Sequence, residues 1–156
     1  VSTSPAMDGT VSLNFGGSVV EPTLLAGVEG GVRWGDWGLL GKVDWNPWFN
    51  LSGAEELIVD GVLNYGLGGE VLYFNRRCRT AVFTGASTLL FETPLDEVGE
   101  TGVFLDIISI SIRWPVTDNI FLRLDPGTLH LVAPVLNEIP LILIEYRHTL
   151  GVEFEL

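Results

Sequence analysis

Hydrophobic and polar residues alternate with a period of two along most of the chain. In residues 11–15, for example, valine, leucine and phenylalanine alternate with serine and asparagine. This spacing places apolar side chains on one face of a β-strand and polar side chains on the other. Glycines stand inside the alternating segments, where they would weaken helices, and no stretch shows a convincing 3.6-residue period. The pattern therefore predicts an all-β fold.

Eight segments carry this alternation and are predicted to be strands. Their ranges are 10–20, 24–34, 37–46, 58–74, 79–91, 103–114, 120–125 and 141–156. Segment 79–91 alternates least regularly, and we assign Ala81 and Phe83 to its apolar face, opposite three threonines. Eight antiparallel strands of this length are enough to close into a small barrel.

The connections between these segments alternate in length. Short turns are expected near residues 35, 76 and 117, whereas the connections over 46–57, 92–102 and 126–140 are long. Short turns at one end and long loops at the other are typical of barrels that cross the bacterial outer membrane. The predicted fold is an eight-stranded antiparallel up-and-down transmembrane β-barrel over residues 10–156, preceded by an N-terminal periplasmic segment, 1–9.

Composition favours a surface that contacts lipid. Of the 156 residues 47% are hydrophobic, and only one of the eight basic residues is a lysine, Lys42, whereas water-facing surfaces are usually rich in lysine. Aromatic residues stand near the ends of the predicted strands, where amphipathic rings meet the bilayer interface. These residues are Trp34, Trp37, Trp45, Trp48, Phe49, Tyr73, Phe74, Phe91, Phe104, Trp114 and Phe121. The alternative is a soluble barrel with the same aromatics in its core.

The polar faces of the predicted strands carry charges of both signs, which can pair inside a barrel of this size. The predicted interior salt-bridge plug consists of Arg33, Lys42, Asp44, Glu70, Arg113, Arg123, Glu145 and Arg147. Four of these, Arg113, Arg123, Glu145 and Arg147, come from three consecutive strands and can meet. The alternative is a gated narrow conduit or a proton path, because charges inside a membrane are often functional.

The C-terminal residues 149–156 read TLGVEFEL. They resemble the C-terminal β-signal of bacterial outer-membrane proteins, which is recognised when these barrels are assembled. The four defined positions of that motif are occupied here by Thr149, Gly151, Phe154 and Leu156, although the family more often ends in an aromatic residue. The resemblance implies an integral outer-membrane protein whose partners are outer-membrane lipid and, during insertion, the outer-membrane assembly machinery.

The charge balance and the first residue restrict the function further. A formal net charge of −12 argues against nucleic acid as a partner, because phosphate would be repelled. No run of about 18 apolar residues is present, so a membrane-spanning helix is not expected. Because the chain begins at Val1 rather than Met, we expect a mature protein whose signal peptide has been removed. The single cysteine, Cys78, rules out an internal disulfide.

Candidate catalytic chemistry is sparse. A deacylase of the kind found among small outer-membrane barrels needs a histidine, a serine and an acid close together. His130 falls in the last long connection and His148 on the outward face of the last strand, whereas Ser109 and Ser111 are expected inside the barrel without a histidine. The scattered histidines and cysteine have no zinc-ligand spacing. We therefore expect no cofactor, no metal and no enzymatic activity.

The last long connection is unusually apolar over residues 128–136. Exposed apolar patches often mark interaction sites, so Leu129, Leu131, Val132, Val135 and Leu136 are candidate contacts with a protein partner. The same residues can instead extend the seventh strand or fold into the barrel mouth. The leading hypothesis is a structural or accessory subunit of a cell-envelope assembly. The alternatives are an enzyme that modifies lipid A or phospholipid, and a narrow barrel for small hydrophobic ligands.

Overall fold

The computed structural model describes residues 6–18, 24–46, 59–91, 100–136, 139–140 and 142–156. Its strands are β1 (Met7–Ser18), β2 (Leu24–Trp34), β3 (Trp37–Asn46), β4 (Val59–Tyr73), β5 (Cys78–Phe91), β6 (Glu100–Pro115), β7 (Ile120–Leu136), β8 (Ile139–Pro140) and β9 (Leu143–Glu155). Within these ranges no helix is long and apolar enough to span a membrane.

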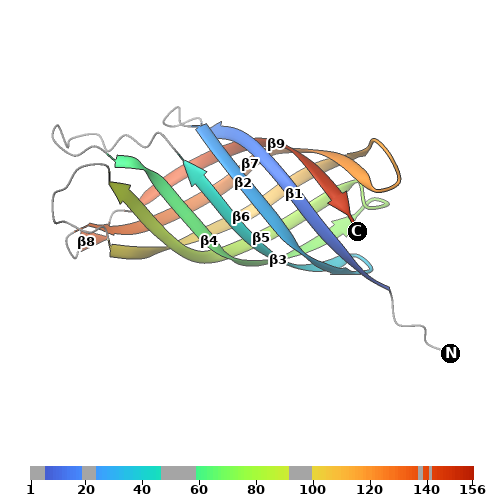
Figure 1. The fold of residues 1–156 in the computed structure, drawn as a ribbon, viewed down its shortest axis with the longest axis horizontal. Coiled ribbons are helices and arrows are strands. Elements are labelled where there is room, and N and C mark those ends of the chain that lie inside the picture. Colours follow the sequence, from blue (N-terminus) through green and yellow to red (C-terminus); the bar gives the residue numbers. More distant parts are fainter. Residues whose placement is uncertain (1–5, 19–23, 47–58, 92–99, 137–138, 141) are drawn as a thin grey trace.

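The strands close into a barrel (Figure 1). From β1 to β7 each strand pairs with the next in antiparallel register, and β9 pairs with β7 on one side and with β1 on the other. The two-residue β8 pairs only with the end of β7. Eight strands therefore form the barrel, as the alternation predicts, and the β1–β9 pairing is the seam that joins the two ends of the chain.

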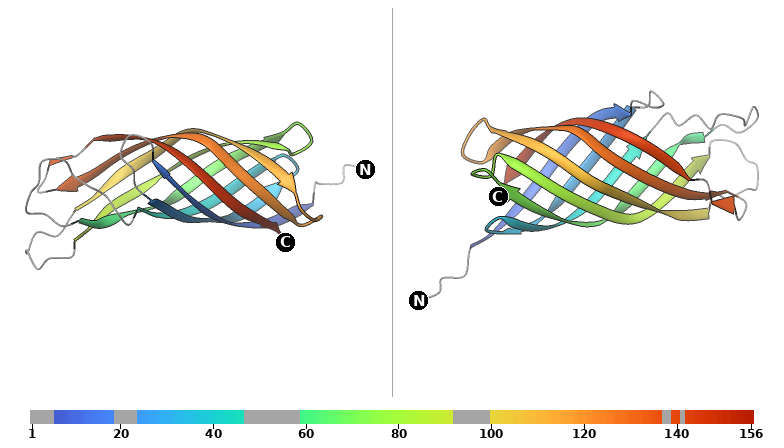
Figure 2. Two further views of the ribbon diagram at one scale, coloured as in Figure 1. Left: turned by 90° about the horizontal axis from the view of Figure 1, so that it is seen from above. Right: turned by 180° about the vertical axis from the view of Figure 1, so that it is seen from behind.

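The short turns lie at one end of the barrel, together with the start of β1 and the end of β9 (Figure 2). Gly35 has a φ of 58° in the β2–β3 turn, a conformation that glycine adopts without a steric penalty. The β4–β5 turn is different, because Phe74, Asn75 and Arg76 all have positive φ. Arg113 holds this turn: its backbone N–H and its Nη1 donate to the carbonyls of Arg77 and Arg76 at 2.7 and 2.6 Å.

The burial pattern is inverted relative to a soluble protein. Leu67 and Phe15 are each 64% exposed on the outer face, whereas Arg113 and Asp106 are fully buried in the lumen. A soluble barrel would place its apolar face inward. The four tryptophans of the described residues are instead exposed on the outer face, so a soluble barrel with these rings in its core does not fit. This distribution suits a barrel whose outer face contacts hydrocarbon.

The predicted faces of the fifth segment are reversed. Ala81 and Phe83 are 1% exposed and point into the lumen, whereas Val82 is 47% exposed on the outer face. Phe104 is likewise buried inside, so it does not belong to the predicted aromatic row at the membrane interface. The lumen thus contains apolar side chains as well as charges, and alternation alone does not separate an apolar side chain that faces the lumen from one that faces lipid.

The seventh strand is much longer than predicted. It runs from Ile120 to Leu136, so the apolar residues 128–136 extend the strand and do not form a loop. A register shift between Asp125 and Thr128 accommodates the Pro126–Gly127 dipeptide, and the alternative in which residues 128–136 extend the strand is confirmed. At the other end of the chain, β1 begins at Met7, inside the segment 1–9 that we assigned to a separate N-terminal region.

Candidate functional site in the barrel lumen

Charged side chains fill the barrel interior in two groups. The group nearer the short turns, called here the turn-side group, contains five guanidinium groups and five carboxylates. Its members are Arg33, Arg76, Arg79, Arg113, Arg123, Glu29, Glu70, Asp125, Glu153 and Glu155. The charges of these ten side chains are therefore equal and opposite.

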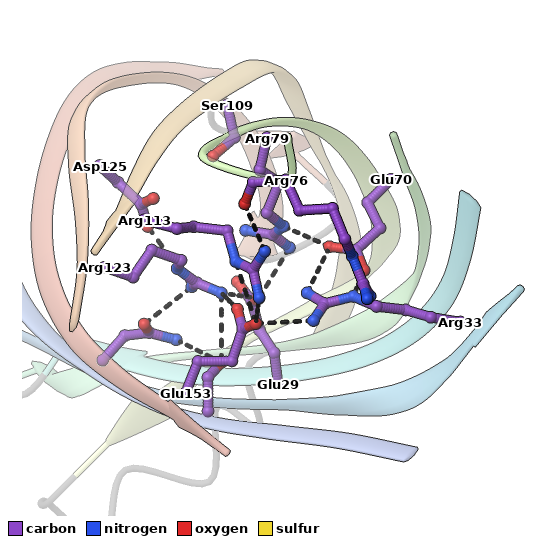
Figure 3. A network of polar contacts seen from close by, with 12 residues as sticks. Glu29, Arg33, Glu70, Arg76, Arg79, Ser109, Arg113, Arg123, Asp125 and Glu153 are labelled. Carbon is purple, nitrogen blue, oxygen red and sulfur yellow. Dashed lines mark hydrogen bonds and ion pairs between the residues drawn. The ribbon is translucent and has the colours of Figure 1, made fainter. Parts of the chain in front are cut away.

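Glu153 on β9 is surrounded by arginines from three other strands. Its Oε1 accepts hydrogen bonds from Arg33 Nη1 and from Arg113 Nη2, each at 2.6 Å. Its Oε2 lies 3.5 Å from Arg123 Nη1. Figure 3 shows these guanidinium groups converging on the carboxylate. Hydrogen bonds between charged groups of this kind are stronger than neutral ones.

Two more carboxylates connect the remaining arginines of the turn-side group. Glu70 accepts from Arg33 Nη2 at 3.2 Å and also from the Nε atoms of Arg33 and Arg79. Glu29 Oε2 accepts from Arg79 Nη2 and from Arg123 Nη1, both at 2.9 Å (Figure 3). Each buried arginine therefore contacts a carboxylate from another strand, which is the condition under which a buried charge is tolerated.

The second group, called here the loop-side group, lies further along the barrel. It consists of Lys42, Asp44, Asp106, His130, Glu145 and Arg147. Arg147 Nη1 donates to Asp44 Oδ1 at 3.2 Å, and Arg147 Nε donates to Glu145 Oε2 at 2.8 Å. Asp106 contacts both Lys42 and His130.

Apolar side chains also fill the lumen. Phe104, Val132 and Leu143 come from three adjacent strands, and Val62 on β4 joins the same cluster. Leu40, Ala81 and Phe83 complete the cluster, with Lys42 Nζ 5.1 Å from the centre of the Phe83 ring. The charged lumen thus contains a packed apolar cluster rather than an open channel.

A small cavity of about 30 Å³ lies against both charged groups, lined among others by Asp125, Arg147, Ser109 and Thr128. Asp125 Oδ1 and Arg147 Nη2 have no hydrogen-bond partner among the described residues. One acceptor and one donor together fit a water molecule, and this volume suffices for one or two. A hydrophobic ligand of ordinary size does not fit in it.

All eight residues of the predicted plug point into the lumen, and seven of them are buried. The exception is Lys42, whose side chain is 13% exposed. The expected meeting of four of them is wrong: Arg113 and Arg123 belong to the turn-side group, whereas Glu145 and Arg147 pair with each other in the loop-side group. The predicted plug also left out six buried residues of the two groups: Glu29, Arg79, Asp106, Asp125, His130 and Glu153. Arg79 shares the period-two face of Ala81 and Phe83, so the reversed assignment of β5 hid it.

The position of His130 corrects a second expectation. The residue lies on β7, fully buried in the lumen with its Nδ1 hydrogen-bonded to Asp106. A histidine therefore does lie inside the barrel with the serines, and its ring is 5.6 Å from that of Phe104. None of the hydrogen bonds found for the described residues joins His130 to a serine, and His130 Nε2 is without a partner among them. Nor do the described residues contain a group of three side chains placed to hold a metal ion.

His148 is on the outer face, as predicted. Its Nδ1 hydrogen-bonds the carbonyl oxygen of Pro126, and its ring packs edge-on against Tyr146 at a centroid distance of 5.0 Å. Pro126 has no N–H to donate and lies at the register shift of β7. The histidine therefore gives the Pro126 carbonyl a hydrogen-bond partner on the outer face of the barrel.

The residues predicted to contact a protein partner lie on different faces of β7. Leu129 is 38% exposed on the outer face, and Leu131 is half-buried. Val132 is only 2% exposed inside the lumen, so it is not available to a partner and that assignment is wrong. Val135 and Leu136 belong to β7, but their side chains lie outside the described part of the structure.

The C-terminal motif forms part of the seam. Thr149 Oγ1 donates to Asp125 Oδ2 at 2.7 Å, and Phe154 and Leu156 are exposed on the outer side. Gly151 is buried opposite Asn14, where a Cβ atom would collide with the Asn14 side chain and the Leu13 carbonyl. A role of this motif in assembly stays a prediction.

No protein-family model and no curated protein sequence matches the chain. Two solved structures are similar to it. Neisserial surface protein A (NspA) matches with a TM-score of 0.66 over 96% of this chain and 96% of that chain, at 11% sequence identity. The Yersinia pestis outer-membrane protein Ail, in a phospholipid bilayer nanodisc, matches with a TM-score of 0.52 over 97% of this chain and 100% of that chain, at 11% identity. This likeness confirms the predicted fold: the chain is a closed eight-stranded antiparallel barrel like these outer-membrane proteins.

Proposed function

We propose that the protein is an integral outer-membrane barrel with a structural or accessory role, as a subunit or partner of a cell-envelope assembly. The observation that carries the proposal is the filled lumen. Two ion-pair groups and an apolar cluster occupy the described interior, and the cavity that lies against the two ion-pair groups has a volume of only about 30 Å³. A barrel filled in this way suits anchoring better than transport.

The outer face supports the membrane location. At the turn end, Trp37, Trp114 and Phe74 are exposed, as rings at a bilayer interface would be. Further along the barrel the exposed side chains are mainly aliphatic, such as Leu67 and Val43. In such a barrel the short turns face the periplasm. The protein is expected to stay with the outer-membrane fraction after carbonate and urea washing, and release into the wash would contradict the location.

We propose no catalytic role for the two histidines. His130 is buried with Asp106, and His148 is engaged with a backbone carbonyl. Replacing both with glutamine in the native strain is expected to leave the acyl-chain composition of lipid A and phospholipid unchanged. A lost or gained lipid species in that strain would instead support the lipid-modifying alternative.

The assembly role is tested by the native mass of the protein after gentle detergent extraction from its own membranes, with the co-purifying chains identified. A stoichiometric complex well above the mass of the 17.0 kDa chain is expected. The outward residues Leu129 and Leu131 on β7 are the first contacts to change to alanine, with Leu67 on β4 as the matched outer-face control. Recovery of the chain as a lone barrel would contradict the assembly role.

A further inference from the structure

The seam between β1 and β9 is the one place where the barrel must join the two ends of its chain. Backbone pairs run from Thr10–Glu155 to Ser18–Arg147, and the N–H of Leu156 donates to the Gly9 carbonyl at 2.8 Å. The buried lumen-facing side chains of β1 are neutral: Thr10, Ser12 and Asn14. Asp8, at the start of the strand, is only half-buried, although its backbone pairs with that of Arg33. None of the ion pairs among the described residues involves β1.

The ion pairs of β9 nevertheless reach across this seam. Arg33 belongs to β2, beyond β1, and its Nη1 donates to Glu153 Oε1 at 2.6 Å and to Glu155 Oε1 at 3.1 Å. On the other side, Arg113 Nη2 donates to the same two oxygens at 2.6 and 2.7 Å. The two carboxylates on the last strand therefore connect β2 to β6 across β1, which contributes to none of the ion pairs of the described residues.

The charge balance of the turn-side group depends on the same two residues. Its five guanidinium groups come from β2, β5, β6, β7 and the β4–β5 turn. Three of its carboxylates, Glu29, Glu70 and Asp125, come from β2, β4 and β7. The last two carboxylates, Glu153 and Glu155, arrive with β9. Without these two carboxylates, closing the barrel would bury five guanidinium groups with three carboxylates of the group, and burying uncompensated charge is unfavourable.

We propose that Glu153, with Glu155 beside it, is an electrostatic latch that drives closure of the barrel at the β1–β9 seam. The last strand brings the two missing negative charges, and the arginines of β2 and β6 draw the two edges together from opposite sides. Both carboxylates contact three arginines. Glu153 is the stronger member because it is fully buried, whereas the Glu155 side chain is 17% exposed.

The test measures seam closure separately from folding elsewhere. In a Cys78→Ser background, Leu13→Cys with Val152→Cys reports the β1–β9 seam, because these positions are paired. Val28→Cys with Val43→Cys is the matched reporter for β2–β3, with similar exposure on the outer face. The full chain is refolded from urea into phospholipid vesicles, samples are oxidised at fixed times, and disulfide yield is measured for each reporter.

Glu153→Gln is compared with Glu145→Gln, which removes the same charge from the same strand but leaves the turn-side group intact. We expect Glu153→Gln to slow seam cross-linking by about tenfold or more, as for loss of one partner of a buried ion pair. The rate of β2–β3 cross-linking in Glu153→Gln is expected to stay within roughly twofold of the rate in the unsubstituted reporter. Glu145→Gln is expected to slow seam cross-linking much less than Glu153→Gln does. Normal seam closure in Glu153→Gln, or a parallel loss at both reporters, would overturn the latch.

A second variant decides the case in which Glu153→Gln does not fold. Arg113→Gln combined with Glu153→Gln leaves four guanidinium groups and four carboxylates, so the charges are again equal. If the latch acts through charge balance, this double variant closes its seam faster than Glu153→Gln alone. If the double variant closes more slowly than Glu153→Gln, or neither of them folds, Glu153 acts through local packing and the proposal is wrong.

Discussion

Replacing Arg147 with methionine tests how strongly the loop-side ion pairs hold the barrel together. The guanidinium lies 3.2 Å from Asp44 Oδ1 and 2.8 Å from Glu145 Oε2. With an effective dielectric constant of about 20, one such pair has a Coulomb energy of roughly 5 kcal/mol before desolvation is subtracted. Removing one partner of a buried ion pair destabilises proteins by about 3–5 kcal/mol, because the other charge remains buried.

Most of this destabilisation is expected to come from the Glu145 carboxylate, which loses its main partner. Asp44 keeps Lys42 Nζ at 3.3 Å and the Asn64 side-chain amide at 2.8 Å. Glu145 keeps, among the described residues, a hydrogen bond of 3.5 Å from Asn46 Nδ2. We therefore predict that Arg147→Met lowers the free energy of unfolding by about 3–5 kcal/mol.

The assay is urea-induced unfolding in phospholipid vesicles, followed by tryptophan fluorescence. The matched control is Arg147→Met combined with Glu145→Gln, which removes the stranded charge together with its partner. This double variant is expected to lie within about 1–2 kcal/mol of the wild type, because removing both partners avoids an uncompensated buried charge. A loss below about 1 kcal/mol in Arg147→Met, or a double variant less stable than the single one, would refute the reasoning.

Four further predictions concern the lumen, the outer face and the seam. In planar bilayers the purified protein is expected to show no channel conductance. Phe83→Ala leaves a cavity in the packed lumen, and it is expected to lower the free energy of unfolding by about 3–5 kcal/mol in the urea assay. His148→Phe removes the hydrogen bond to the Pro126 carbonyl and is expected to lose about 1–2 kcal/mol, with faster amide exchange next to the bulge. Gly151→Ala is expected to reduce the folded fraction on unheated gels because its Cβ meets the opposite strand, whereas Gly30→Ala has ordinary contact distances and should fold normally. Steady conductance steps, unchanged exchange at the bulge, or equal folding of the two glycine variants would each contradict the corresponding prediction.

The strands were predictable wherever one face is uniformly apolar and the other uniformly polar. The segment from Val11 to Phe15 is an example, because its three apolar side chains face outward and Ser12 and Asn14 are buried. The prediction failed on β5, where Phe83 faces the lumen. A phenylalanine has the same hydrophobicity whether it packs in the apolar cluster of the lumen or against lipid, so the local pattern does not show which face of the strand it occupies.

The extent of β7 was not predictable for a different reason. Pro126 lacks an N–H and normally ends a central strand. Here the register shifts against β9 and against β6 accommodate Pro126 and Gly127, and pairing resumes on both sides, so that His130 lies opposite Asp106 and Glu145. Only the neighbouring strands decide whether a chain continues past such an irregularity.

The sequence by itself determined the all-β class, the number of barrel strands, the end that carries the short turns and the inward direction of the eight predicted plug residues. These properties depend on period-two alternation and on turn residues, which act over a few positions. The tertiary structure alone decided which charges meet. Arg33 and Glu153 are 120 residues apart, and they pair because closure of the sheet brings β2 and β9 to either side of β1. Which charged side chains pair inside a closed barrel depends on the strand register and on the circumference of the barrel. Both are properties of all eight strands together.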